Sequence, residues 1–181
     1  MLNDPVNFVD PLGLDISLQW HAVQGKNLHT LIRITPENQA KYINDPRFHN
    51  KDALGNNYLT IGAGPIPIIN GRLVSNINRD SDILLHPKDS TFELNNGCQN
   101  EDQLISDLLL YNANYMDNLD YDLFPANSQN AKWYLPDDGY NSNSYISGLL
   151  SKAGIKKPKV TDTPGWDKPV PLKYFNPRKS F

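Results

Sequence analysis

Residues 141–154 read Asn-Ser-Asn-Ser-Tyr-Ile-Ser-Gly-Leu-Leu-Ser-Lys-Ala-Gly, which is the pattern of a short packed helix. Its apolar residues recur at helical spacing and face one way: Tyr145, Ile146, Leu149, Leu150 and Ala153. Small polar residues crowd the start of the segment and Gly154 closes it, as is typical of helix caps. One cap needs only one polar side chain, so capping does not explain the remaining polar residues at the start.

Ser142 stands where a nucleophile would gain from the end of this helix. A helix N-terminus carries partial positive charge and backbone amides that stabilise an alkoxide and can line an oxyanion hole. The base must come from elsewhere in the fold, and His29 is the best placed histidine because it heads a predicted strand. We therefore predict Ser142 as nucleophile and His29 as base, with a purely capping role for Ser142 as the alternative.

The sequence leaves two features of this site open. A third group should orient the imidazole, and Asn76, Asn78 and Asp80 all qualify by their place on or after a predicted strand. Cys98 is a competing nucleophile, just before the longest predicted helix. A lone cysteine is more often a buried small hydrophobe, and this one has no aromatic residue three positions later to anchor a helix.

Local patterns elsewhere predict an α+β fold, with an antiparallel sheet packed against this helix and a longer one. The predicted strands are residues 28–35, 58–69 and 72–77, with a hairpin signal at Asn70-Gly71. The predicted helices are residues 37–43, capped by Thr35, and 100–116, capped by Asn100. Gly62 and Gly64 fall inside a strand, where a bulge is the expected role.

Composition excludes several classes of protein. The chain has 181 residues, of which 39% are hydrophobic, and this fits one folded domain. The net charge of −3 argues against a generally basic nucleic-acid binder. No apolar run approaches the ~18 residues of a membrane-spanning helix, and the first residues lack the pattern of a secretory signal. One cysteine and irregularly spaced histidines give no recognisable metal site, so we expect no metal and no cofactor.

Charge is unevenly spread along the chain. Residues 151–181 hold 8 basic and 2 acidic side chains, a net charge of +6, which leaves 9 basic and 18 acidic side chains, or −9, in residues 1–150. We expect this proline-rich basic segment to pack across the acidic body as an extended strap. The alternative is a patch that faces an anionic partner.

Residues 5–14, Pro-Val-Asn-Phe-Val-Asp-Pro-Leu-Gly-Leu, resemble the end of the RHS-repeat core of bacterial polymorphic toxins. The resemblance implies that residues 1–14 end such a core and that residues 15–181 form the toxin domain, released by cleavage after Leu14. It also implies secretion and delivery into a target cell for interbacterial competition. The implied partners are a core shell that encloses the domain and a cognate immunity protein.

Residues 142–155 are similar to the catalytic helix of NlpC-like papain-fold hydrolases, in which Asp-Cys-Ser-Gly-Phe-Val precedes an apolar pair and Ala-Gly-Ile. Ser142 takes the place of the nucleophilic cysteine and Asn141 that of the preceding aspartate. The circularly permuted branch, which includes lecithin:retinol acyltransferase-like proteins, has its histidine strand first, and residues 29–32 resemble that strand. The resemblance implies a permuted papain-like fold, and it departs from the family at the nucleophile itself.

These observations favour an antibacterial effector domain that hydrolyses an amide or ester through an acyl-enzyme on Ser142, with His29 as base. The substrate would be macromolecular or a lipid. The alternative is a nuclease toxin that uses His21 and His29 with the basic C-terminal segment, although the chain's charge argues against a stable nucleic-acid complex. A pore-forming or binding module is disfavoured because no long amphipathic or apolar helix is expected.

Overall fold

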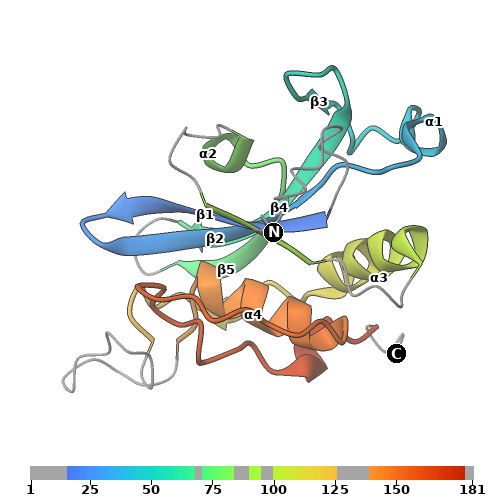
Figure 1. Cartoon of the computed structure of the whole chain (residues 1–181). Helices are drawn as coiled ribbons and strands as arrows, with labels where there is room; N and C mark the ends of the chain where they lie inside the picture. The colour runs from blue at the N-terminus through green and yellow to red at the C-terminus, as the bar shows by residue number, and fades with distance from the viewer. Residues whose placement is uncertain (1–15, 68–70, 84–89, 95–99, 126–138, 178–181) are drawn as a thin grey trace, which may run out of the picture.

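The computed structural model describes residues 16–67, 71–83, 90–94, 100–125 and 139–177. This part of the chain forms a mixed α and β fold with a seven-stranded sheet and four α-helices (Figure 1). The strands are β1 (Ile16–Gln24), β2 (Asn27–Ile34), β3 (Asn50–Lys51), β4 (Asn57–Ile66), β5 (Arg72–Ile77), β6 (Ser90–Glu93) and β7 (Leu119–Asp120). The helices are α1 (Gln39–Tyr42), α2 (Asp80–Ile83), α3 (Glu101–Asn114) and α4 (Ser142–Lys152), with a 3-10 turn at Leu172–Phe175.

Three sequence-based assignments fall outside the described residues. They are the toxin-core segment with its cleavage point after Leu14, the hairpin residue Asn70 and the competing nucleophile Cys98.

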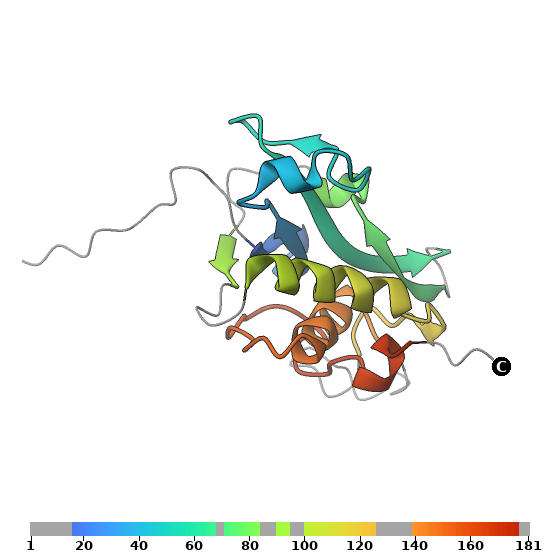
Figure 2. The same ribbon diagram turned by 90° about the vertical axis from the view of Figure 1, so that its right-hand side faces the viewer.

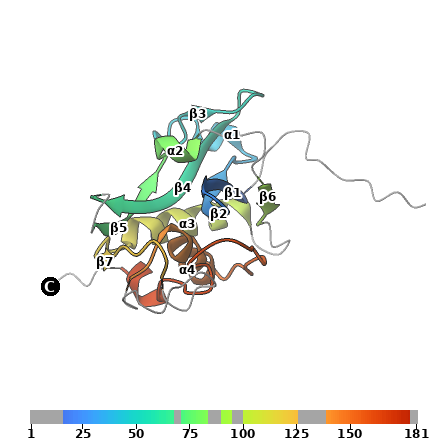
Figure 3. The same cartoon turned by 90° about the vertical axis from the view of Figure 1, so that its left-hand side faces the viewer.

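The strands run in the order β6-β1-β2-β4-β5-β7, and β3 pairs with β4 (Figure 3). All pairings between these strands are antiparallel. The predicted strands at 28–35, 58–69 and 72–77 are confirmed as β2, β4 and β5, with small changes at the ends. β1 was not predicted from the sequence, although its nine residues form the longest antiparallel pairing with β2.

The two predicted helices outside residues 141–154 are both present. α3 begins after Asn100, whose side chain accepts a hydrogen bond from the Gln103 backbone as predicted. The short helix at 37–43 is also present, but the predicted cap is wrong. Asn38 caps α1, whereas Thr35 is buried and its hydroxyl accepts a hydrogen bond from Arg33.

The sheet separates two layers. α3 and α4 cover one face, and α2 lies on the opposite face (Figure 1). Side chains of the sheet, α3 and α4 make the main core between them, and burying each large apolar side chain contributes about 1.5–3 kcal/mol. Fully buried members from the three elements include Leu18, Ile32, Ile61, Leu108, Tyr145 and Leu149.

β2 and β4 pair over only part of their length. Hydrogen-bonded register joins Ile32–Ile34 to Leu59–Ile61, and the earlier part of β2 has no pairing with β4. The strands therefore separate toward the start of β2. The N-terminus of α4 meets β2 at this opening, where Asn143 contacts the backbone of Thr30.

α4 is buried on every side rather than along one stripe. All residues from Ser142 to Leu150 are buried, because the C-terminal segment 155–177 wraps the side of α4 that faces away from the sheet (Figure 2). The Val170 backbone donates to the Ser144 carbonyl at 2.9 Å. Gly148 permits this approach, since a Cβ there would lie 2.5 Å from the Val170 carbonyl oxygen.

Residues 155–177 of the predicted strap thus pack across α4, and the contacts that hold them include apolar ones. Val170 and Phe175 are fully buried in the core cluster, so apolar packing fixes the segment together with its hydrogen bonds to α4. The Phe175 ring lies 5.6 Å from that of Tyr145, which joins the end of the strap to the middle of α4.

Candidate active site

Ser142 and His29, predicted as a catalytic pair, lie in hydrogen-bond contact. Ser142 begins α4, and His29 is the third residue of β2. The Ser142 Oγ lies 2.9 Å from the His29 Nδ1, although the two residues are 113 positions apart in the chain. Both side chains are largely buried and border one pocket. The fold therefore brings the predicted pair together, and their catalytic role remains a prediction.

Asp82 lies beside His29, where a third group would lie, and none of the three candidates from the sequence does. The His29 Nε2 lies 3.2 Å from the Asp82 Oδ1. Asp80 is exposed at the start of α2, and Asn78 instead accepts a hydrogen bond from the Thr60 backbone. Asn76 lies on β5, opposite Gly62. Asp82 is buried, because the single turn of α2 directs it toward the sheet.

One tautomer of neutral His29 suits both contacts. If Ser142 donates to Nδ1, that nitrogen is unprotonated and the ring proton lies on Nε2, which faces Asp82. The N–H is not well aligned with the Asp82 Oδ1, so this contact is mainly electrostatic. Catalytic hydrogen bonds are often loose before substrate binds.

The environment of Asp82 keeps its carboxyl ionised at neutral pH. Burial acts to raise the pKa of this group, because a charge is disfavoured away from water. The neighbouring His29, a hydrogen bond from Ser81 and the charge of Arg79 act in the opposite direction. Together they outweigh burial and hold the pKa of Asp82 below its ordinary value of 3.8. A carboxylate here stabilises the imidazolium that forms when His29 takes a proton.

Two glycines of β4 make room for the groups that approach from α2. A Cβ on Gly62 would lie 2.2 Å from the Asp82 Oδ2, and a Cβ on Gly64 would lie 2.3 Å from the Arg79 Nη1. The predicted bulge at these glycines is wrong, since β4 and β5 pair in continuous register across both positions. Close approach of other side chains is the reason for the glycines.

Asn143 joins the start of α4 to the strand that carries His29. Its Oδ1 accepts from the Thr30 backbone N–H at 2.8 Å and from the Thr30 hydroxyl at 2.9 Å. Its Nδ2 donates to the Leu28 carbonyl at 2.8 Å and to the Pro164 carbonyl at 3.0 Å. Leu28 and Thr30 flank His29, so Asn143 holds His29 in register with Ser142.

The other small polar residues at this helix start also have partners. Asn141 caps α4 by accepting from the Ser144 N–H, and its Nδ2 donates to the carbonyls of Leu123 and Pro164. The Ser144 hydroxyl donates to the Gly165 carbonyl at 3.0 Å. Of the four polar residues, Ser142 is the one whose side chain contacts an ionisable group that borders the pocket.

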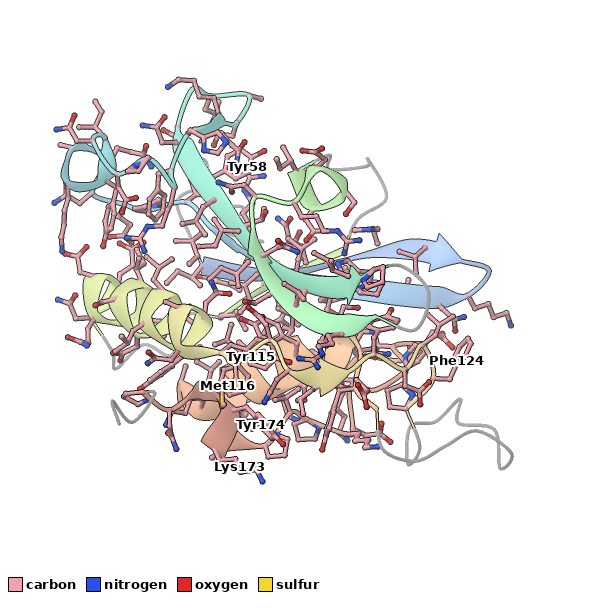
Figure 4. The ribbon with its side chains drawn as sticks, turned by 180° about the vertical axis from the view of Figure 1, so that it is seen from behind. Tyr58, Tyr115, Met116, Phe124, Lys173 and Tyr174 are labelled. Atoms are coloured by element: carbon pink, nitrogen blue, oxygen red, sulfur yellow. The ribbon has the colours of Figure 1, made fainter. Side chains whose placement is uncertain are left out.

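The pocket in front of Ser142 has a volume of about 560 Å³. Most of its wall is apolar, and it includes Leu28, Ala63, Pro65 and Phe124. Phe124, seen in Figure 4, lies on the same side of the molecule as the hairpin between β1 and β2. Such a wall suits a substrate that brings an apolar portion to the nucleophile.

Histidine and arginine also line this pocket. The ring centroids of His21 and His29 are 5.2 Å apart, so the two histidines of the nuclease alternative do meet. Among the described residues of the C-terminal segment, only Pro164 lines the pocket, so the basic side chains required by that alternative are not at the site. Among the described lining residues, Arg79 is the one with a permanent positive charge.

The remaining sequence observations concern another histidine, metal ligands and membrane-spanning helices. His49, the remaining described histidine, is exposed. Within the described residues, no three metal-ligating side chains of His, Cys, Asp or Glu are grouped together. Among the helices that the structure describes, none has the length and apolar character needed to cross a bilayer.

Comparison of the chain with protein-family models, with curated proteins and with solved structures finds no match.

Replacing Asn143 with alanine should destabilise the fold. The change removes the hydrogen-bonding partners of two backbone groups at the opening between β2 and β4, and we expect the free energy of unfolding to fall by about 2–4 kcal/mol. Urea denaturation followed by circular dichroism measures this loss. The same change at exposed Asn44 provides the control and should have little effect. Equal stability of the two variants would contradict the role given to Asn143.

Asp82 should stabilise the fold in a pH-dependent way. Because its folded-state pKa is below 3.8, its contribution is present above that pH and is lost as pH falls through the folded-state pKa. We therefore expect Asp82→Asn to be less stable than the wild type by about 1–3 kcal/mol at pH 6, with the gap closing below about pH 4. Urea titrations at several pH values measure the gap, and a gap that stays constant down to pH 3 would refute this account.

Proposed function

We propose that residues 15–181 form a hydrolase that cleaves an amide or ester bond through an acyl-enzyme on Ser142. The observation that carries the proposal is the chain of contacts from Ser142 to His29 to Asp82 at the edge of a pocket. A nucleophile, a base and a group that orients the base are the parts that this reaction class requires.

The reaction would proceed in two halves. His29 removes the proton from the Ser142 hydroxyl through Nδ1 as Oγ attacks the substrate carbonyl, and Asp82 stabilises the resulting imidazolium. The imidazolium then gives that proton to the leaving amine or alcohol. Water attacks the acyl-enzyme with His29 again as base, which releases the acid and restores Ser142.

The first turn of α4 is suited to stabilise the tetrahedral intermediate. The Ser144 N–H is taken by Asn141, and the Tyr145 N–H bonds to the Asn141 carbonyl. The amides of Ser142 and Asn143 have no partner within the helix, because they precede the first helical hydrogen bond. They, together with the partial positive charge of the helix start, can receive the oxyanion.

Serine in place of cysteine is compatible with this chemistry. A serine hydroxyl is scarcely ionised near neutral pH, so it depends on a base that accepts its proton during attack. His29 is within hydrogen-bond distance for that transfer, and a buried carboxylate lies behind it. The histidine strand also precedes the nucleophile helix in the chain, which is the order of the permuted papain-like fold that we propose for this domain.

We further propose that the hydrolase is an antibacterial effector, delivered by secretion into a target cell. This part of the proposal depends on the resemblance of residues 5–14 to the end of an RHS core. A producing cell would then need an immunity protein against the released domain.

A fluorophosphonate probe tests the nucleophile directly. We expect one covalent adduct, located on Ser142 by peptide mass spectrometry, because the probe reacts with activated serines. Ser142→Ala should abolish the adduct, and Asp82→Asn should slow labelling by about 100-fold or more by disturbing the orientation and charge balance of His29.

Ser151→Ala is the matched control for that experiment. Ser151 lies on the same helix, where its hydroxyl donates to the Ser147 carbonyl away from the pocket. This variant should be labelled like the wild type. Labelling of Ser142→Ala at the wild-type rate, or an unreactive wild type, would show that Ser142 is not an activated nucleophile.

Expression in a bacterial host tests the toxin proposal. Residues 15–181 should arrest growth when directed to the compartment that holds the substrate, cytoplasm or periplasm, and Ser142→Ala should relieve the arrest at equal levels of folded protein. Arrest that persists in folded Ser142→Ala would end the hydrolase proposal. Degraded nucleic acid in those cells would favour the nuclease alternative.

A further inference from the structure

Arg79 lines the pocket beside the proposed catalytic residues, at a position where a glycine of β4 makes room for its side chain. It directly precedes α2, and its side chain extends over β4 to Gly64, where a Cβ would lie 2.3 Å from the guanidinium. Asp82 lies over Gly62 in the same way. Gly62 precedes Gly64 by two residues, so both glycines are on the same face of β4. Alternate residues of a strand are about 7 Å apart, so the guanidinium is seated roughly that far from the carboxylate of Asp82.

The guanidinium of Arg79 has little to bind within the protein. Its one hydrogen bond to the described residues is a long contact of 3.4 Å from Nη1 to the Ala63 carbonyl. No carboxylate of the described residues lies within ion-pair distance of it. A partly buried guanidinium retains donors that favour a planar, negatively charged partner.

The charge of the pocket indicates what that partner would be. Among the residues that the structure describes, the lining contains no aspartate, glutamate or lysine, so within this set Arg79 carries the one permanent charge. One guanidinium neutralises a singly charged acid, whereas a doubly charged phosphate monoester would retain uncompensated charge beside an apolar wall. The pocket wall around Arg79 includes Pro65, Tyr121 and Leu123. These side chains can contact the carbon atoms of a substrate that lie between its acid group and its reacting carbonyl.

We propose that Arg79 selects acyl donors that carry a carboxylate, which it binds while Ser142 attacks a carbonyl elsewhere in the same molecule. This inference rests on the proposed hydrolase function and specifies its substrate class. The carboxylate stays bound to Arg79 through both halves of the reaction and takes no part in bond making. Arg79 is thus a specificity residue.

A matched pair of esters tests the inference. p-Nitrophenyl hydrogen adipate and p-nitrophenyl hexanoate have acyl chains of the same length, and only the first carries a carboxylate at its far end. With spontaneous hydrolysis subtracted, we expect kcat/KM to be at least about 10-fold higher for the adipate ester. Arg79→Gln should reduce this ratio by about 10–100-fold, and Arg79→Lys should retain part of it because the charge remains without the planar fork.

The ratio of the two esters separates recognition from a structural effect. Arg79 also contributes to the electrostatics of Asp82, so its loss could slow both esters alike and leave the ratio unchanged. An unchanged ratio would overturn the inference while leaving the hydrolase proposal intact. Arg72→Gln, at an exposed position of β5, is the control for loss of one arginine and should leave the ratio as in the wild type.

Binding to the Ser142→Ala protein gives a readout that does not need hydrolysis. Hexanoate should bind more tightly than neutral hexanamide by calorimetry or NMR titration, and Arg79→Gln should remove the difference. Tighter binding of the singly charged diethyl phosphate would overturn the choice of a carboxylate. Failure of both esters to react, with hexanoate still selected through Arg79, would refute the hydrolase proposal and support the anion site.

Discussion

The side-chain amide of Asn143 holds the site together. β2 and β4 must separate for the end of α4 to reach His29, and this leaves strand backbone groups of Leu28 and Thr30 without a partner strand. Unpaired buried backbone groups are costly, so the opening needs a substitute partner. Asn143 supplies it, with its amide in the place of a peptide group. Ser142 precedes Asn143 in the chain, and His29 lies between the two strand residues, so one set of hydrogen bonds aligns both.

The burial of α4 follows from this insertion. The side of α4 that faces away from the sheet carries Ser144, Ser147 and Gly148, which are buried. The C-terminal segment covers that side, and successive carbonyls of Pro164, Gly165 and Trp166 accept hydrogen bonds from side chains of α4. The small residues that interrupt the apolar pattern are the ones that let the segment approach. The same small residues of α4 therefore allow close packing of the C-terminal segment and provide its carbonyls with hydrogen-bond donors.

Much of the fold could be predicted from patterns within single elements. Features that depend on contacts between residues far apart in the chain could not. β5 and α3 were predictable because their apolar periodicity and caps lie within the elements themselves. The pair of Ser142 and His29 could be proposed from their places at a helix start and a strand start. Asp82 could not, because its single helical turn has no periodicity and its burial depends on β4. Its one signal was the pair of glycines in that strand, which marks close approach of other groups.

The covering of α4 by the C-terminal segment also sets an order of events during synthesis. The carbonyls that fix the start of α4 belong to residues that follow α4 in the chain and are translated after it, and Val170 and Phe175 complete the core beneath it. While the ribosome still holds those residues, α4 lacks these partners and its serine has no fixed position relative to the histidine. A nascent chain therefore carries Ser142, His29 and Asp82 before the fold has brought the three side chains together.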